Sequence, residues 1–234
     1  AMNRLGIVFQ HGAAMGLNVD LNAVAKAKAL LGKSRHQPAN IPALHWSEVP
    51  EFYKSISENT VTNLALRLLI LTGVRSFALR HIMANQVKDK VWTIPGKNMK
   101  GTIGKLSDFR VPLSNQASEI IQLALQFATN GYLFPGNKKG VISDATMSRM
   151  MERRGMLERP HGFRSSLRTW LADCTDAPEE IAETILSHSP GNKVVKAYRR
   201  TDFFEQRAIL MQRWADHVTG VSNIKNLILP IRSK

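Results

Sequence analysis

The sequence has a single cysteine, Cys174, among its 234 residues. One cysteine forms no internal disulfide and supplies no Cys-x-x-Cys zinc pair, so a disulfide scaffold and a zinc module of that type are excluded. We expect Cys174 to be a small buried side chain.

Long hydrophobic runs are also missing. The longest apolar stretch, residues 61–74, contains Asn63 and Arg67 and is too short to span a bilayer. No basic segment followed by an apolar leader opens the chain. We therefore expect a cytoplasmic protein without a membrane partner.

Acidic residues are few relative to basic ones. The chain has 32 Lys and Arg against 18 Asp and Glu, a net charge of +14 and a pI near 10.3. This balance is typical of polyanion binders, and nucleic acid is the leading partner because the basic residues are spread along the whole chain. The acids form no D-x-D or PD…E-x-K arrangement, so a metal-dependent nuclease is disfavoured and neither metal nor cofactor is expected.

Helical periodicity dominates what is present. Spacing and capping predict helices over residues 4–15, 21–31, 49–57, 60–72, 115–129, 143–154, 161–173, 178–187 and 202–218. Residues 91–94 and 109–113 resemble short strands on either side of a basic connection, which predicts an antiparallel hairpin with a long tip. Residues 33–42 include two prolines and predict a linker. The fold class is therefore mainly α with a small antiparallel sheet.

The first candidate site segment is Thr72-Gly73-Val74-Arg75. Arg75 follows a glycine that ends an apolar helix, and a new helix is expected to begin at about Ser76. An arginine at such a turn is well situated to meet a phosphate. The alternative is a solvated arginine after a helix stop.

The second segment contains His161 and Arg164, three residues apart at a predicted helix start. Both side chains then project from one face, with the helix dipole behind them. An imidazole that exchanges a proton near pH 7 and a guanidinium that binds phosphate oxygens suit phosphoryl transfer. The alternative is a capping histidine beside a surface arginine.

The third segment contains His188 at a helix end and Tyr198 ten residues later. Tyr198 is flanked by Lys196, Arg199 and Arg200, and such cations favour phenolate formation from an ordinary pKa near 10. Tyr53 and Tyr132 have no comparable sequence setting. Tyr198 is therefore the tyrosine whose sequence setting most favours a reactive phenolate.

In this order, Thr-Gly-x-Arg, His-x-x-Arg, Leu-x-His and Tyr resemble the signature of the tyrosine recombinases, also called the phage integrase family, over about residues 41–218. Flanking runs at Trp92, Met99-Lys100, Val111, His161 and Trp214 are most similar to those of prophage and genomic-island integrases. The resemblance implies a tyrosine recombinase catalytic fold, mainly helical with a small sheet.

The resemblance also implies a domain organisation. Residues 1–40 would be the C-terminal part of a helical core-binding (clamp) domain with its linker. Residues 41–220 would form the catalytic domain, and residues 221–234 a tail that packs on a neighbouring protomer.

Residue roles carried over from the family give a concrete site. Arg75 and Arg164 would hold the scissile phosphate, and Tyr198 would attack it to leave a 3′-phosphotyrosyl enzyme. Lys100 would protonate the leaving 5′-oxygen. His161 would assist proton transfer at the tyrosine. His188 would hydrogen-bond the phosphate.

The implied function is site-specific recombination that integrates or excises a mobile element without metal or ATP. Expected partners are double-stranded DNA attachment sites, further copies of the chain in a tetramer on synapsed DNA, and accessory DNA-bending or directionality factors. A DNA-binding protein that lost the chemistry is the alternative. A type IB topoisomerase shares the chemistry, but the integrase-like flanking runs disfavour it.

Two features depart from the family pattern. The position three residues after the first arginine usually carries a bracing acid, but here it is Ala78. Either another group holds Arg75 or the site is slack. The hairpin tip is long, so Lys105, and less so Lys97, compete with Lys100 as the general acid.

Overall fold

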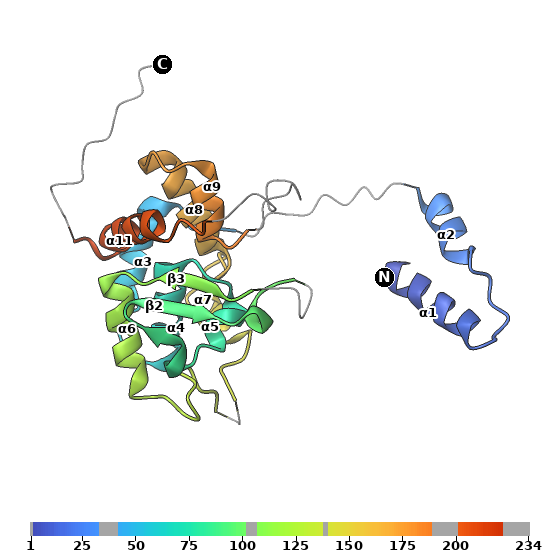
Figure 1. Ribbon diagram of the computed structural model, residues 1–234, viewed down its shortest axis with the longest axis horizontal. Helices are drawn as coiled ribbons and strands as arrows, with labels where there is room; N and C mark the ends of the chain where they lie inside the picture. Colours follow the sequence, from blue (N-terminus) through green and yellow to red (C-terminus); the bar gives the residue numbers. More distant parts are fainter. Residues whose placement is uncertain (1, 33–41, 102–106, 138–139, 189–200, 222–234) are drawn as a thin grey trace, which may run out of the picture. The chain divides into compact units, whose positions relative to one another are not determined.

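The computed structural model describes residues 2–32, 42–101, 107–137, 140–188 and 201–221 (Figure 1). The chain divides into two compact units, Ala1–Asn40 and Ile41–Lys234. The assignment of the first unit to a clamp domain stays a prediction. The predicted tail from residue 222 onward lies outside the described residues.

The first unit contains α1 (Met2–Ala14) and α2 (Ala23–Leu31). Helix α2 begins later than predicted because Asp20 accepts the backbone N–H of Asn22 in a turn before the helix. Gly32 ends α2 with a φ of 68°. Two short helices cannot bury a core of their own. Large apolar side chains of this unit remain exposed, namely Leu5, Ile7, Val8, Met15, Leu17, Leu21, Leu30 and Leu31.

The second unit is mainly helical, as predicted. The α-helices among its described residues are α3 (Val49–Ser55), α4 (Val61–Thr72), α5 (Ser76–Arg80), α6 (Asn115–Leu125), α7 (Thr146–Arg153), α8 (Gly162–Cys174), α9 (Glu179–Ile185) and α11 (Phe204–Thr219). Short 3-10 turns lie at Trp46–Glu48, Ala84–Gln86 and Gly96–Asn98. Where a helix was predicted between residues 49 and 218, the structure has one, with ends that differ by a few residues.

A three-stranded antiparallel sheet lies in this unit, in the order β1 (Val87–Lys88), β2 (Val91–Ile94), β3 (Phe109–Pro112). The predicted hairpin is confirmed, with Val91 paired to Pro112 and Ile94 to Phe109. Strand β1 was not predicted because two residues show no periodicity. It joins β2 through Asp89 and Lys90, whose φ values of 49° and 58° are those of a tight type I′ turn.

Helix α4 is the centre of the core. Its residues from Leu64 to Leu71 are buried apart from Arg67, and the helix contacts α5, α6, α7, α8 and α11. Trp214 of α11 is fully buried and donates its indole N–H to the carbonyl of Ile70 at 2.9 Å. Because five other helices pack around α4, the position of its C-terminal end is fixed. Cys174 is only half-buried and packs against the edge of this core.

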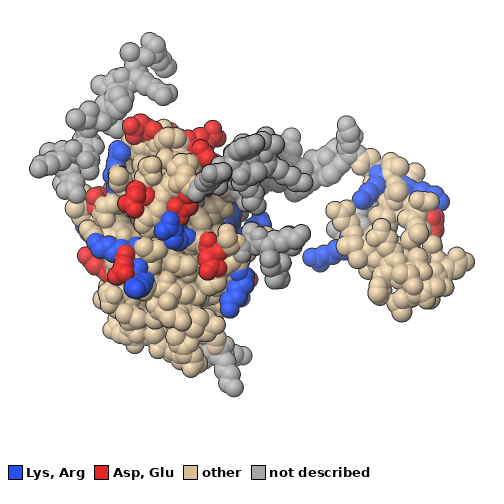
Figure 2. All heavy atoms as spheres, in the orientation of Figure 1, with Lys and Arg blue, Asp and Glu red and all other residues tan. Residues whose placement is uncertain are grey.

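The outer surface carries charges of both signs. Figure 2 shows basic and acidic side chains intermixed on one face of the larger unit, so this face does not have the uniform positive charge expected of a DNA-binding surface. Among the described helices, none has the length and apolar character needed to cross a bilayer.

Candidate active site

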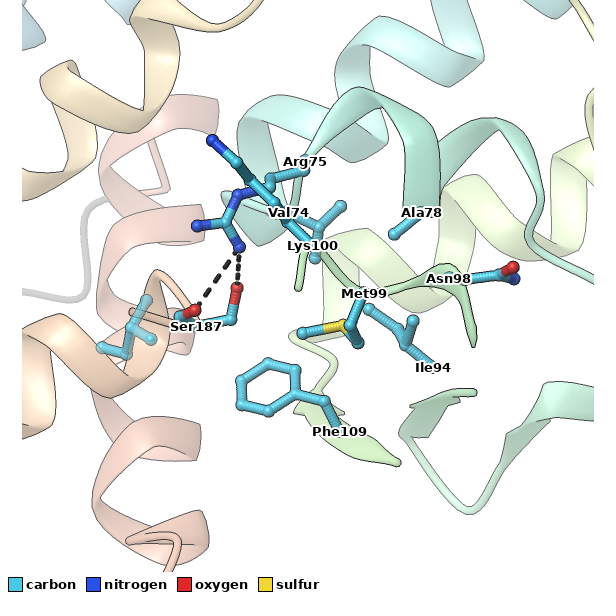
Figure 3. A pocket seen from close by; sticks show the side chains of 10 residues that line it. Val74, Arg75, Ala78, Ile94, Asn98, Met99, Lys100, Phe109 and Ser187 are labelled. Atoms are coloured by element: carbon cyan, nitrogen blue, oxygen red, sulfur yellow. Dashed lines mark hydrogen bonds between the residues drawn. The ribbon is translucent and has the colours of Figure 1, made fainter. Parts of the chain in front are cut away.

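Arg75 lies in the turn between α4 and α5. Gly73 ends α4 in the left-handed conformation with a φ of 62°, and Arg75 is the residue just before α5, so the predicted helix stop and restart are confirmed. The Nη1 atom of Arg75 donates to the Oγ of Ser187 at 2.6 Å and to the carbonyl of Ser187 at 3.4 Å (Figure 3). Burial lowers the pKa of Arg75. Arg75 is therefore a held, partly buried cation and not a freely solvated one.

Arg164 lies in the first turn of α8 and is only 4% exposed. Its Nη1 donates to the carbonyl of Gly73, and its Nη2 donates to the carbonyl of Leu186 at 2.6 Å. These carbonyls belong to the ends of α4 and α9, so one guanidinium ties three helices together. Burial, and then the charge of Arg75, lower the pKa of Arg164 to about 10, which leaves it protonated at pH 7.

His161 is the residue that precedes α8, and its side chain makes no capping hydrogen bond. The capping alternative considered for it is therefore wrong. Burial lowers its pKa, and the positive charges of Arg164, Arg75 and Lys100 lower it further. These groups are near enough to act on the imidazole, which is neutral at pH 7 and able to accept a proton.

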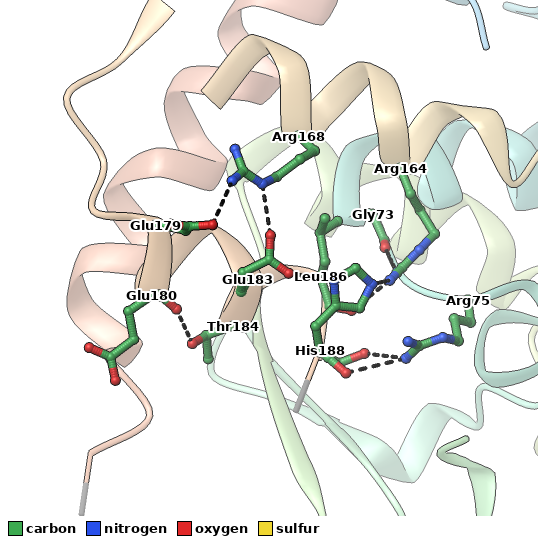
Figure 4. Close-up of polar contacts among 11 residues, drawn as sticks. Gly73, Arg75, Arg164, Arg168, Glu179, Glu180, Glu183, Thr184, Leu186 and His188 are labelled. Carbon is green, nitrogen blue, oxygen red and sulfur yellow. Dashed lines mark hydrogen bonds and ion pairs between the residues drawn. The ribbon is translucent and has the colours of Figure 1, made fainter. Parts of the chain in front are cut away.

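His188 lies just beyond the end of α9. Its Nε2 is 3.1 Å from the Nη2 of Arg164, and its Nδ1 is 2.6 Å from the Oε2 of Glu183 (Figure 4). The helix end turns back on itself, with Ser187 at a φ of 51° and the N–H of His188 bonded to the carbonyl of Glu183. This turn directs Ser187 to one arginine and His188 to the other.

Lys100 lines a small cavity together with Arg75, Ser187 and the buried Ala78 (Figure 3). Lys97 lines a different cavity, beside Tyr132. Lys105 lies outside the described residues. Of the described lysines of the hairpin connection, Lys100 is thus the one that shares a cavity with Arg75.

Tyr198 lies outside the described residues, and its predicted role stays a prediction. The other tyrosines offer no substitute. Tyr53 is buried in the core, where burial raises its pKa although Arg67 stacks on its ring at 5.0 Å. Tyr132 is half-buried and does not line the cavity that contains Arg75.

The residues Arg75, Lys100, His161, Arg164 and His188 form what we call the cationic cluster. They come from four segments: the α4–α5 turn, the β2–β3 connection, the start of α8 and the end of α9. Within the described part of the chain, no carboxylate forms an ion pair with Arg75 or Arg164, and no group of three metal-ligating side chains occurs. Glu183 contacts His188, but both arginines lack a carboxylate partner among the described residues, so their charge is available to a phosphate.

The sequence matches the model of the phage integrase family over residues 43–205. The chain belongs to the phage integrase family. The matched range contains every member of the cationic cluster and also Tyr198, and it covers most of the second unit.

Curated relatives are prophage and phage integrases. The prophage integrase IntA of Escherichia coli K12 is 28% identical over 205 residues, covering 82% of this chain and 48% of the relative. The integrase of Shigella phage Sf6 is 27% identical over 227 residues, covering 92% of this chain and 57% of the relative. The chain thus spans about half the length of the curated relatives it matches.

Solved integrase structures share the fold. An integrase from mycobacterium phage Brujita aligns with a TM-score of 0.59 at 19% identity, covering 91% of this chain and 70% of that one. A lambda integrase tetramer bound to a Holliday junction aligns with a TM-score of 0.59 at 16% identity, covering 82% of this chain and 58% of the lambda integrase chain. These likenesses establish the tyrosine recombinase fold that the resemblance implied.

Sequence reasoning missed two polar residues of the site, Ser187 and Glu183. Ser187 is the variable position of the Leu-x-His motif and bonds Arg75, whereas Glu183 lies outside the motifs and bonds His188 across a helix end. The available signal was their place, one and five residues before His188. Spacing alone does not reveal the contact between Glu183 and His188. Residues five apart in a helix do not face each other, and these two meet only because the helix ends between them and the chain folds back.

Proposed function

We propose that this chain is the catalytic part of a site-specific DNA recombinase that cleaves and rejoins strands through a 3′-phosphotyrosyl intermediate. The observation that carries this proposal is the cationic cluster, in which four separated segments bring two arginines, two histidines and a lysine to one site. Family membership supplies the reaction type, and the predicted nucleophile, Tyr198, follows the cluster in the sequence.

The proposed cleavage exchanges one phosphate ester for another. Tyr198 Oη bonds to the phosphorus while the bond to the 5′-oxygen breaks, and His161 takes the tyrosine proton. Arg75 and Arg164 stabilise the charge that grows on the non-bridging oxygens. Lys100 gives a proton to the leaving 5′-oxygen.

Rejoining is the same chemistry in reverse on a new strand end. A free 5′-hydroxyl attacks the phosphotyrosine, so the covalent link stores the bond energy and neither ATP nor metal is needed. His188 hydrogen-bonds the phosphate in both directions. The reaction would insert or remove a mobile element such as a prophage or genomic island.

The proposed partners are double-stranded DNA attachment sites and further copies of the chain. One relative of the same fold is described as a lambda integrase tetramer bound to a Holliday junction, and another as a Tn1549 transposon integrase in complex with circular intermediate DNA. By analogy we propose a tetramer on synapsed DNA, acting in the cytoplasm at the nucleoid, with accessory bending or directionality factors.

We also propose that residues 1–40 are the end of a clamp domain that holds the other face of the DNA. The exposed apolar side chains of α1 and α2 support this, because a helix pair of this kind is usually part of a larger bundle. The assignment of residues 221–234 to a tail that would pack on a neighbouring protomer is likewise a proposal, from the family resemblance alone.

A nicked suicide substrate tests the proposal. Its core site is taken from the junction sequences of the element that encodes the chain, and the reaction is run in EDTA. We expect a covalent protein–DNA band with the native chain and none with Tyr198→Phe, which lacks only the attacking oxygen. A missing band with the native chain, or a band that needs magnesium, contradicts the proposal.

The second candidate function is DNA binding without cleavage. Its support is Ala78, which stands at the position that usually carries the bracing acid and lines the cavity beside Arg75. The contact between Arg75 and Ser187 argues against a slack site, because the guanidinium has another partner. The suicide substrate separates the two functions, since a binding protein shifts the DNA without forming the covalent band.

A further inference from the structure

The carboxylate of Glu183 is shared between the active-site histidine and an arginine. Its Oε2 lies 2.6 Å from Nδ1 of His188, and its Oε1 accepts a hydrogen bond of 2.8 Å from Nε of Arg168 (Figure 4). Partial burial raises the pKa of Glu183, but the hydrogen bonds from Arg168 and His188, together with the charge of Arg168, lower it by more, so the pKa lies below its ordinary value. Glu183 is therefore an ionised acceptor at pH 7.

An ionised carboxylate can only accept hydrogen bonds, so the proton on the His188 ring lies at Nδ1. The other nitrogen, Nε2, is then the one that faces Arg164, at 3.1 Å. In this neutral tautomer Nε2 has a lone pair that accepts the hydrogen bond from Arg164; only a ring protonated on both nitrogens could donate to a phosphate oxygen, and ionised Glu183 lies where it would balance that charge. Both the ring orientation and the choice of nitrogen that meets the phosphate thus depend on Glu183.

Helix α8 holds the Glu183 carboxylate through Arg168. Arg164 and Arg168 are one helical turn apart, so the same face of α8 presents one guanidinium to the site and the other to Glu183. Glu179 lies farther from Arg168, at 3.8 Å, and is 84% exposed, and it has no contact with His188 among the described residues. Of these two partners of Arg168, Glu183 is therefore the one that also bonds to His188.

We propose that Glu183 is a positioning residue for strand cleavage, which acts by fixing the tautomer and orientation of His188. The inference rests on the proposed function, because it assigns His188 to the phosphate. The competing explanation is an ordinary surface ion pair between α8 and α9, which would contribute little to stability and nothing to the chemistry.

The first test reads the tautomer and needs no activity. Long-range proton–nitrogen NMR spectra of the histidine rings, with His188 assigned by its loss in His188→Ala, should show the proton at Nδ1. In Glu183→Ala we expect a mixed or Nε2-protonated ring, whereas Glu179→Ala should match the native spectrum. An unchanged His188 tautomer in Glu183→Ala overturns the proposal.

The second test is a double-mutant cycle on single-turnover cleavage of the suicide substrate at saturating DNA. Glu183→Ala should slow cleavage by roughly 10- to 100-fold with DNA affinity unchanged within about two-fold, a loss like that seen when the hydrogen-bond partner of a metal-bound histidine is removed. In the His188→Ala background the same change should cost nothing further. Glu183→Gln, which keeps an acceptor without the charge, should fall between. Glu179→Ala should cleave at the native rate.

The outcomes separate the two proposals. If the double variant loses cleavage rate by the product of the two single-variant losses, Glu183 acts independently of His188 and the inference fails. If Glu183→Ala cleaves at the native rate, the inference fails while the proposed function stands. If the native chain forms no adduct, the proposed function fails, and the NMR test still decides what Glu183 does to His188.

Discussion

At the scale of single residues, Ser187 combines a strained backbone with a functional contact. Its φ of 51° is left-handed, a conformation that usually falls to glycine at a helix end and costs other residues about 1 kcal/mol. Its hydroxyl accepts a 2.6 Å hydrogen bond from Arg75. A hydroxyl orients the guanidinium without neutralising it, so the full charge of Arg75 stays available to a phosphate.

Two substitutions separate the strain of Ser187 from its contact. Ser187→Gly relieves the backbone and Ser187→Ala does not, but both remove the hydroxyl. We expect the glycine variant to be the more stable by about 1 kcal/mol in urea unfolding. We expect both variants to lose cleavage alike, by about ten-fold. The contrary result is a cleavage rate that is near native in the more stable Ser187→Gly and reduced in Ser187→Ala. It would mean that the serine has a structural role only.

The pKa of His161 predicts a pH dependence. Burial and the neighbouring positive charges lower this pKa, so the imidazole loses its proton below the ordinary value of about 6.5. If neutral His161 is the base, kcat/KM for cleavage should fall only below that pH, and the acidic limb should be lost in His161→Asn. A limb that is unchanged in His161→Asn would assign the proton transfer to another group.

At the scale of elements, the end of α4 fixes both arginines. Gly73 has a positive φ, its carbonyl binds Arg164, and a Cβ added to it would lie 2.5 Å from the Cδ2 of Leu167 on α8. Glycine is required here by conformation and by space together.

Replacing Gly73 by alanine should destabilise the fold by roughly 2–4 kcal/mol, the sum of left-handed strain and overpacking. The matched control is Gly220, which ends α11 with a φ of 69° and has nothing within 4 Å of an added Cβ. Gly220→Ala should cost only about 1 kcal/mol. Equal losses of unfolding free energy in the two variants would show that packing against Leu167 contributes nothing.

Most helices of the second unit could be predicted because caps and apolar spacing are local signals. Strand β1 could not, since its two residues are defined by pairing with β2. Within the site, the motifs identified Arg75, His161, Arg164 and His188, each next to a helix end. The contacts that hold them could not be predicted, because they join segments that meet only after folding.

At the scale of the whole molecule, the charge of +14 predicts salt-sensitive DNA binding. Phosphate contacts release counterions, so log affinity should fall linearly with log salt, with a slope of about −0.9 per phosphate neutralised. Fluorescence anisotropy on a labelled core-site duplex at several salt concentrations measures this slope. An affinity independent of salt would contradict a DNA partner.

The central claim is that the cationic cluster and Tyr198 form one active site in which lysine protonates the leaving oxygen. The most direct measurement compares single-turnover cleavage of an ordinary core-site substrate with that of one carrying a 5′-bridging sulfur, a leaving group that hardly needs a proton. Lys100→Ala should slow the ordinary substrate on the order of 10²–10⁴-fold and recover most of its rate on the sulfur substrate, while Tyr198→Phe stays inactive on both. Rescue of Lys105→Ala instead of Lys100→Ala, or any covalent adduct with Tyr198→Phe, would contradict this account.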